Sequence, residues 1–125
     1  MKIDTDFVMT INGRAVSTDH TQPVYNPATR SVFAQVPDAS KAQLDETVST
    51  ARQAFTSWSQ TPAAERQAAL ERFADLIEEN AEGIMSLLTR EQGKPRAGAE
   101  WEVFGSADWL RATGSLRLPE EVVDE

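Results

Sequence analysis

The sequence contains no cysteine and a single histidine, His20. Without cysteine the chain has neither a disulfide framework nor a thiol nucleophile. His20 lies in the polar stretch STDHTQP with no second base or ligand at a useful spacing, so we expect a solvated loop histidine. A Gly-rich phosphate loop and an HExxH motif are also missing. We therefore propose no catalytic residue and no cofactor-binding residue in this chain.

Basic residues are scarce: 12 Lys and Arg stand against 20 Asp and Glu, a formal net charge of -8. This balance argues against nucleic acid and against anionic membrane surfaces as partners. No apolar run approaches the roughly 20 residues that a membrane helix needs, and the N-terminal stretch MKIDTDFVMTING lacks the apolar core of a signal peptide. The composition predicts a soluble cytoplasmic protein with a modest hydrophobic core.

A long amphipathic helix is predicted over residues 61–95. Apolar side chains recur there at steps of three and four residues and form one stripe, which consists of Leu70, Phe73, Ile77, Ala81, Ile84 and Leu88. The carboxylates of Glu78, Glu79 and Glu82 have no obvious partner at helical spacing. We interpret them as a solvated face rather than as an acidic site.

The ends of this helix carry recognisable signals. Thr61 is expected to cap it and Pro62 suits its first position, while Gly93 favours a left-handed C-cap. Asn80 and Gly83 predict a kink or a short break in the middle.

Short strands are predicted before the helices. Residues 7–11 and 14–16 flank Asn12-Gly13, the strongest two-residue hairpin signal. Residues 17–23 are polar and typical of a loop. A second strand pair is expected around the turn that follows Tyr25, with residues 32–37 as its last strand.

Two further helices flank the long one. Ser40 and Gln43 form an S-x-x-Q capping box, so a helix is predicted from Lys41, with its apolar stripe at Leu44, Val48, Ala51, Phe55 and Trp58. The short link after Trp58 predicts that this helix and the next are neighbours in space.

The last predicted helix spans residues 97–112 and is apolar on more than one face, through Trp101, Val103, Phe104, Ala107, Trp109 and Leu110. Such a helix requires cover on several sides. We expect Trp58, Trp101 and Trp109 to pack in a core rather than line a pocket.

Lys94 is interpreted as a cation that complements the helix dipole rather than as an anion site, and Val122-Val123 is interpreted as the start of a strand.

The order of these features resembles the opening of the aldehyde dehydrogenase superfamily. The resemblance covers essentially the whole chain and rests on several motifs in the right order. They are Ile11-Asn12-Gly13, Tyr25-Asn26-Pro27-Ala28-Thr29, the V-x-A-x-V-P strand, Ala54-Phe55 before Trp58, the Arg66…Leu70…Ala74-Asp75-Leu76-Ile77 series, Glu91-Gln92-Gly93-Lys94-Pro95, Glu102-Val103 and Leu118-Pro119.

The resemblance implies a mainly α fold with short N-terminal β-hairpins, an α+β fragment of the α/β aldehyde dehydrogenase fold that lacks the complete cofactor-binding sheet. Residues 1–37 are expected to form the hairpin region. Residues 38–125 are expected to form a three-helix portion of the cofactor-binding domain, truncated at the C-terminus.

The family reaction oxidises an aldehyde to a carboxylic acid with NAD(P)+ through a cysteine thiohemiacetal. The family's cysteine, glutamate base and oxyanion asparagine lie beyond the end of this chain, so the resemblance implies a chain that is inactive alone. NAD or NADP would be needed only by the full-length parent; the sequence separates neither these cofactors nor the aldehyde. The alternative is a small stand-alone helical module with an interaction or structural role.

Two binding expectations follow from the resemblance. An incomplete monovalent-cation site is implied at the backbone oxygens of Val24 or Tyr25 and the carboxylate of Glu102, because oxygen ligands suit such ions. The expected partners are further copies of this chain, which would cover Trp101, Phe104 and Trp109, or the missing C-terminal part of the enzyme.

Overall fold

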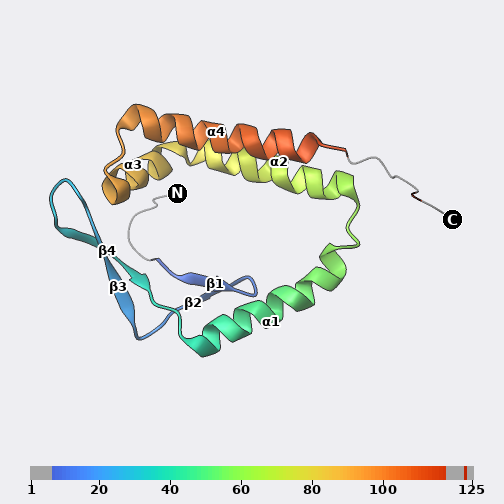
Figure 1. Ribbon diagram of the computed structural model, residues 1–125, viewed down its shortest axis with the longest axis horizontal. Coiled ribbons are helices and arrows are strands. Elements are labelled where there is room, and N and C mark those ends of the chain that lie inside the picture. The colour runs from blue at the N-terminus through green and yellow to red at the C-terminus, as the bar shows by residue number, and fades with distance from the viewer. Residues whose placement is uncertain (1–6, 118–122, 124–125) are drawn as a thin grey trace.

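Two small antiparallel strand pairs precede four helices in the computed structural model of the protein, which describes residues 7–117 and Val123 (Figure 1). The predicted mainly α fold with N-terminal hairpins is therefore confirmed. Leu118-Pro119 and the strand expected from Val122 lie outside the described residues. The elements are β1 (Met9–Ile11), β2 (Arg14–Val16), β3 (Thr21–Tyr25), β4 (Val32–Pro37), α1 (Lys41–Trp58), α2 (Ala63–Glu79), α3 (Ala81–Gln92) and α4 (Arg96–Ser115).

The first hairpin forms where Asn-Gly predicted it. Met9 pairs with Val16 and Ile11 with Arg14, and the turn residues Asn12 and Gly13 have φ values of 52° and 71°. Positive φ at both central residues is the geometry that matches the twist of a two-stranded hairpin. Ile11 is buried and anchors this pair beside α1.

The second hairpin joins β3 to β4, with Thr21 opposite Pro37 and Val24 opposite Ala34. The Asn26 Oδ1 atom accepts a hydrogen bond of 2.9 Å from the Ala28 N–H and holds the turn. The prediction of a loop over residues 17–23 is wrong at its end, because β3 begins at Thr21. Backbone pairing with β4 outweighs the polar character of these residues.

Helix α1 begins with the predicted capping box. The Ser40 Oγ atom accepts from the Gln43 N–H at 3.2 Å, and the Gln43 Oε1 atom accepts from the Ser40 N–H at 2.9 Å. The prediction that α1 and α2 are near neighbours in space is wrong: the main contact of α1 is with β1, whereas α2 packs on α4 and α3. In Figure 1 α1 runs along the opposite side of the molecule from α2. The chain turns between the two helices at residues 59–62, where the Gln60 N–H donates to the Ser57 carbonyl at 3.1 Å.

The long predicted helix is broken at Asn80, as expected: α2 ends at Glu79 and α3 begins at Ala81. Gly93 takes the left-handed C-cap with φ 68°. The predicted Thr61 cap is wrong, because Pro62 is the N-cap of α2 and no side chain caps this end. The Thr61 hydroxyl instead donates back to the Ser57 carbonyl at 3.5 Å.

The core lies where α4 runs alongside α2 and α3 (Figure 1). Its buried residues are Ala81, Met85, Ala99 and Val103, and half-buried Ile77, Ile84 and Leu88 pack against them. Small side chains let these helices approach closely. The predicted stripe is confirmed from Ile77 onwards but fails at Phe73, which is 54% exposed, because the neighbouring Ala74 faces inward instead.

None of the helices in the described part of the chain has the length and apolar content required to cross a membrane.

Candidate functional site

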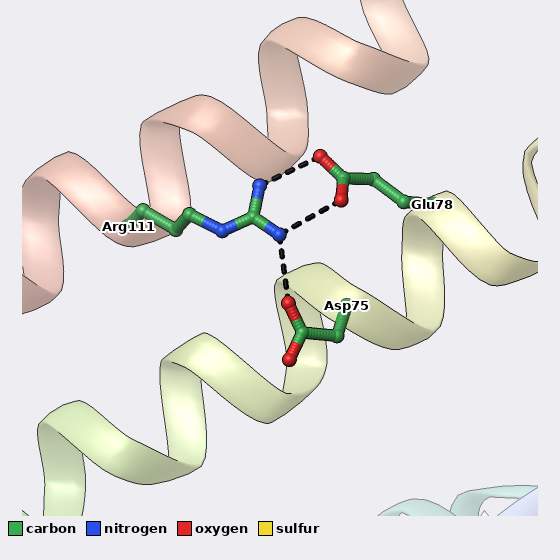
Figure 2. Close-up of polar contacts among 3 residues, drawn as sticks. All are labelled: Asp75, Glu78 and Arg111. Atoms are coloured by element: carbon green, nitrogen blue, oxygen red, sulfur yellow. Dashed lines mark hydrogen bonds and ion pairs between the residues drawn. The ribbon is translucent and has the colours of Figure 1, made fainter.

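A three-residue ionic cluster fastens α4 to α2 (Figure 2). Arg111 on α4 donates from Nη1 to Glu78 Oε1 at 2.6 Å and from Nη2 to Glu78 Oε2 at 2.8 Å. The same Nη2 atom donates to Asp75 Oδ1 at 2.7 Å. The planar guanidinium thus donates two hydrogen bonds to the Glu78 carboxylate and a third to the Asp75 carboxylate. This arrangement fixes the orientation of the Arg111 side chain more firmly than a lysine ammonium would. We call these three residues the Arg111 clamp.

The charges in the Arg111 clamp stabilise one another. The hydrogen bonds from Arg111 lower the pKa of Glu78 below its ordinary value of 4.5, and the bonds to Glu78 and Asp75 raise the pKa of Arg111. A carboxylate that is held ionised in this way is a poor proton acceptor at neutral pH. The clamp therefore serves structure rather than acid–base chemistry.

The interpretation of Glu78, Glu79 and Glu82 as a solvated face is confirmed for Glu79 and Glu82, which are exposed, and is incomplete for Glu78, which is half-buried. Glu78 pairs with Arg111, and Glu82 pairs with Arg96 at the start of α4; the bond from Arg96 also lowers the pKa of Glu82. These partners lie 33 and 14 residues away along the chain. The spacing of residues within α2 or α3 cannot predict these ion pairs, because Arg96 and Arg111 approach the carboxylates only when α4 packs alongside those helices.

The junction between α3 and α4 touches the second hairpin. A Cβ atom at Gly93 would lie 3.0 Å from Pro27 Cγ, in the turn between β3 and β4. Beside it, Lys94 forms an ion pair with Glu102 on α4. The ammonium group thus lies just after the C-terminal end of α3, and its role as a complement to the helix dipole stays a prediction.

The residues of the expected cation site lie on two elements. Val24 is half-buried in β3, Tyr25 at the end of β3 is exposed, and Glu102 is on α4. The Glu102 carboxylate is already neutralised by Lys94, so a bound cation would have to displace this ammonium group. Within residues 7–117 and 123, no group of three His, Asp or Glu side chains is placed to hold a metal ion. The monovalent-cation site stays a prediction.

An apolar hollow of about 170 Å³ separates the second hairpin from α3, lined by Phe7, Val24, Phe33, Ala34, Val36, Leu87 and Glu91. The Arg90 guanidinium lies 4.5 Å from the centroid of the Phe33 ring and adds a cation–π contact. This cation–π contact links the second hairpin to α3 across the edge of the hollow. His20 is exposed before β3, as predicted.

The outward side of α4 is aromatic and uncovered. Trp101 is 80% and Trp109 76% exposed, and they flank an open hollow that is also lined by Glu102, Gly105, Ser106, Asp108 and Ala112. We call Trp101, Gly105, Trp109 and Ala112 the α4 outer face. The prediction that the tryptophans pack in a core is wrong within this chain, since Trp58 is also 51% exposed.

Helix α1 carries a second uncovered apolar surface. It contains no buried residue, and four of its apolar side chains are each more than half exposed: Leu44, Val48, Phe55 and Trp58, which we call the α1 stripe. The helical period predicted this stripe, but in the described structure α1 has few contacts, chiefly with β1 and through the Gln43 amide, which donates to the Ser17 carbonyl at 3.1 Å. Together with the α4 outer face, it gives the described chain two separate exposed apolar surfaces.

The described strands do not fit a dinucleotide. Both strand pairs are antiparallel, whereas the pyrophosphate of such a cofactor is seated between a parallel strand and the following helix. Among residues 7–117 and 123 we assign no residue to NAD or NADP.

The sequence matches the aldehyde dehydrogenase family over residues 15–120. It is 38% identical to a probable aldehyde dehydrogenase of Pseudomonas sp. over 125 residues, which is 100% of this chain and 26% of that protein. It is 41% identical over 96 residues to the human mitochondrial methylmalonate-semialdehyde/malonate-semialdehyde dehydrogenase [acylating], covering 75% of this chain and 18% of that protein.

Solved structures agree with the sequence matches. The aldehyde dehydrogenase of Brucella melitensis biovar abortus superposes with a TM-score of 0.83 and 34% identity, covering 88% of this chain and 23% of that one. The NAD-dependent benzaldehyde dehydrogenase of Corynebacterium glutamicum superposes with a TM-score of 0.79 and 34% identity, covering 84% and 23%. The chain thus spans about a quarter of the length of these relatives, and it belongs to the aldehyde dehydrogenase family.

Proposed function

We propose that this chain is the N-terminal scaffold segment of an NAD- or NADP-dependent aldehyde dehydrogenase. The whole enzyme would oxidise an aldehyde to a carboxylic acid through a cysteine thiohemiacetal. The observation that carries the proposal is the match of all 125 residues to about a quarter of the Pseudomonas relative. The segment contributes a rigid α2–α3–α4 unit, fastened by the Arg111 clamp, and two apolar surfaces on which further elements can rest.

The isolated chain is then expected to oxidise no aldehyde. It contains no cysteine, so it has no thiolate to attack the carbonyl carbon. The described strands also offer no seat for a dinucleotide. The alternative, a self-sufficient helical module, fits poorly with an α1 that contains no buried residue and an α4 that leaves two indoles uncovered. On its own the chain is expected to self-associate through these surfaces.

An activity assay tests the proposal. The purified 125-residue chain is incubated with acetaldehyde or benzaldehyde and either NAD+ or NADP+, and formation of the reduced cofactor is followed. We expect a rate equal to the buffer blank and no heat of NAD+ binding in calorimetry. The full-length Corynebacterium benzaldehyde dehydrogenase is the positive control. Turnover by the isolated chain would overturn the proposal, because it would require a nucleophile other than cysteine.

A further inference from the structure

We propose that the α1 stripe is a dimerisation surface, on which α1 of a second copy of this chain packs in the antiparallel direction. The inference rests on the self-association that the proposed function expects of the isolated chain, and it adds the surface and the pairing. In Figure 1 α1 lies along one edge of the molecule, on the opposite side from α2. The exposed α1 stripe is thus accessible to a second chain.

The spacing of the α1 stripe is that of a two-stranded coiled coil. Together with Ala51, its residues follow one another at steps of four, three, four and three, which is the heptad repeat of a seam between two helices. Helix α1 has 18 residues, so it presents about two and a half heptads over ~27 Å. Gln43, Thr47 and Thr50 are its half-buried residues and lie on a different side of the helix. The contact with β1 therefore leaves the seam open.

An antiparallel arrangement pairs the seam residues by size. In one register Phe55 of the first copy lies opposite Leu44 of the second, and Val48 lies opposite Ala51. The large side chains are then at the outer layers, and the small Ala51 at the centre lets the two helices approach closely. Because the arrangement has two-fold symmetry, each of these contacts occurs twice.

The charges beside the seam favour the same register. Asp45 lies opposite Arg52 of the second copy, at positions whose charges set the orientation of paired helices. Within the described residues Arg52 forms no ion pair, and the pair of Asp45 with Lys41 is exposed and adds little. At the end of the seam Lys41 would lie beside the indole of Trp58 of the second copy, which attracts an ammonium group. A parallel pair would instead place Arg52 beside Thr47 and form no ion pair.

The α4 outer face is less suited to a second copy. In a two-fold contact this surface meets itself, so Asp108 would face its own counterpart and a hollow would face a hollow. Helix α1 carries two acidic and two basic residues. Its surface is therefore electrically neutral and can meet a second copy, although each chain has a net charge of -8.

Sedimentation velocity of the 125-residue chain over roughly 5–500 µM tests the inference. We expect a monomer at the dilute end and a dimer at the concentrated end. Val48→Asp places a charge in the seam of both copies and should weaken dimerisation at least ~30-fold. Val48 is 53% exposed in the single chain, so the variant is expected to keep its fold, which circular dichroism checks. The matched control is Ser49→Asp, at the next position and outside the seam, which should dimerise like the unchanged chain.

Exchanging the charges tests the direction of the helices. Arg52→Asp and Asp45→Arg each convert both cross-chain ion pairs into like-charge pairs, so each variant alone should dimerise at least ~10-fold more weakly. Mixed in equal amounts, the two variants should form a heterodimer about as tightly as the unchanged chain, because opposite charges again face each other. Both variants remain net negative, so overall attraction cannot cause this recovery. The control Glu46→Arg makes the same charge change as Asp45→Arg on the far side of α1 and should dimerise like the unchanged chain.

A monomer at every concentration, or a dimer that Val48→Asp leaves intact, would overturn the inference. So would a mixture of the two charge variants that dimerises no better than either alone, since the helices would then not be antiparallel. A dimer that Trp109→Asp abolishes and Val48→Asp does not would assign the contact to the α4 outer face and leave the proposed function standing. Aldehyde oxidation by the isolated chain would instead overturn the proposed function and would not change these association results.

Discussion

Helices α1 and α4 are both long and rich in apolar residues, but they are held in very different ways. Helix α4 buries Ala99, Val103 and Ala107 and is fastened to α2 by the Arg111 clamp. Helix α1 buries no residue, has a complete capping box and makes its main element contact with β1. A cap and a helical period are therefore enough to form a helix, whereas its position depends on a neighbour that matches its apolar side.

The largest expected effect breaks the packed side of α4. Val103 is 2% exposed in the core, so Val103→Asp places a charge among apolar side chains. We expect a loss of about 3 kcal/mol or more in the free energy of unfolding, measured by urea denaturation with circular dichroism. The control is Phe104→Asp at the next position, which is 40% exposed and should cost less than about 1 kcal/mol. Equal losses would contradict the two-sided description of α4.

A medium effect is expected from Arg111→Met, which removes the clamp but keeps most of the side-chain length. In the folded chain the pKa of Glu78 is lowered below 4.5, so its pairing stabilises the fold above that pH. This stabilisation is lost as the pH falls through the lowered pKa. The variant should therefore have a lower Tm at neutral pH and a flatter decline in Tm below about pH 4.5.

The control for charge alone is Arg52→Met on α1. Arg52 is exposed and forms no ion pair within the described residues. Its Tm and its acid dependence should equal those of the unchanged chain. If both variants respond to pH in the same way, Glu78 does not act through Arg111.

The smallest expected effect on global stability comes from the α1 cap. Ser40→Ala removes the side-chain acceptor for the Gln43 N–H, at a cost of about 1 kcal/mol to the helix. Because α1 is not part of the core, hydrogen exchange should accelerate in its first turns while the unfolding midpoint of α2–α4 stays unchanged. Ser49→Ala, at an exposed position within α1, is the control and should not accelerate exchange. A shifted midpoint in Ser40→Ala would show that α1 is coupled to the core.

Local features were predictable from the sequence because their causes are local. Asn12-Gly13 specifies a turn with positive φ, Ser40 and Gln43 specify a helix start, and Gly93 specifies a helix end. Each of these signals acts within about four residues of chain. The resemblance to the aldehyde dehydrogenase family was predictable for a different reason, since it depends on the order of motifs along the whole chain.

The candidate site was less predictable, because its contacts join distant parts of the chain. Glu78 and Arg111 are 33 residues apart. No periodicity within α2 predicts which basic residue will pair with Glu78. The prediction that the tryptophans pack in a core was wrong for a related reason. An indole has the chemistry of a core residue, but whether it is covered depends on which elements surround it.

The sequence alone determined most of the helix and strand ends, although not the start of β3 at Thr21 or the cap of α2, and most of the apolar side of each helix. Only the tertiary structure decided which apolar side was used: Ala99 and Val103 became core, whereas the α4 outer face and the α1 stripe stayed open. The physical reason is that hydrogen bonds and caps act over a few residues, while burial depends on close packing of surfaces brought together from distant parts of the chain.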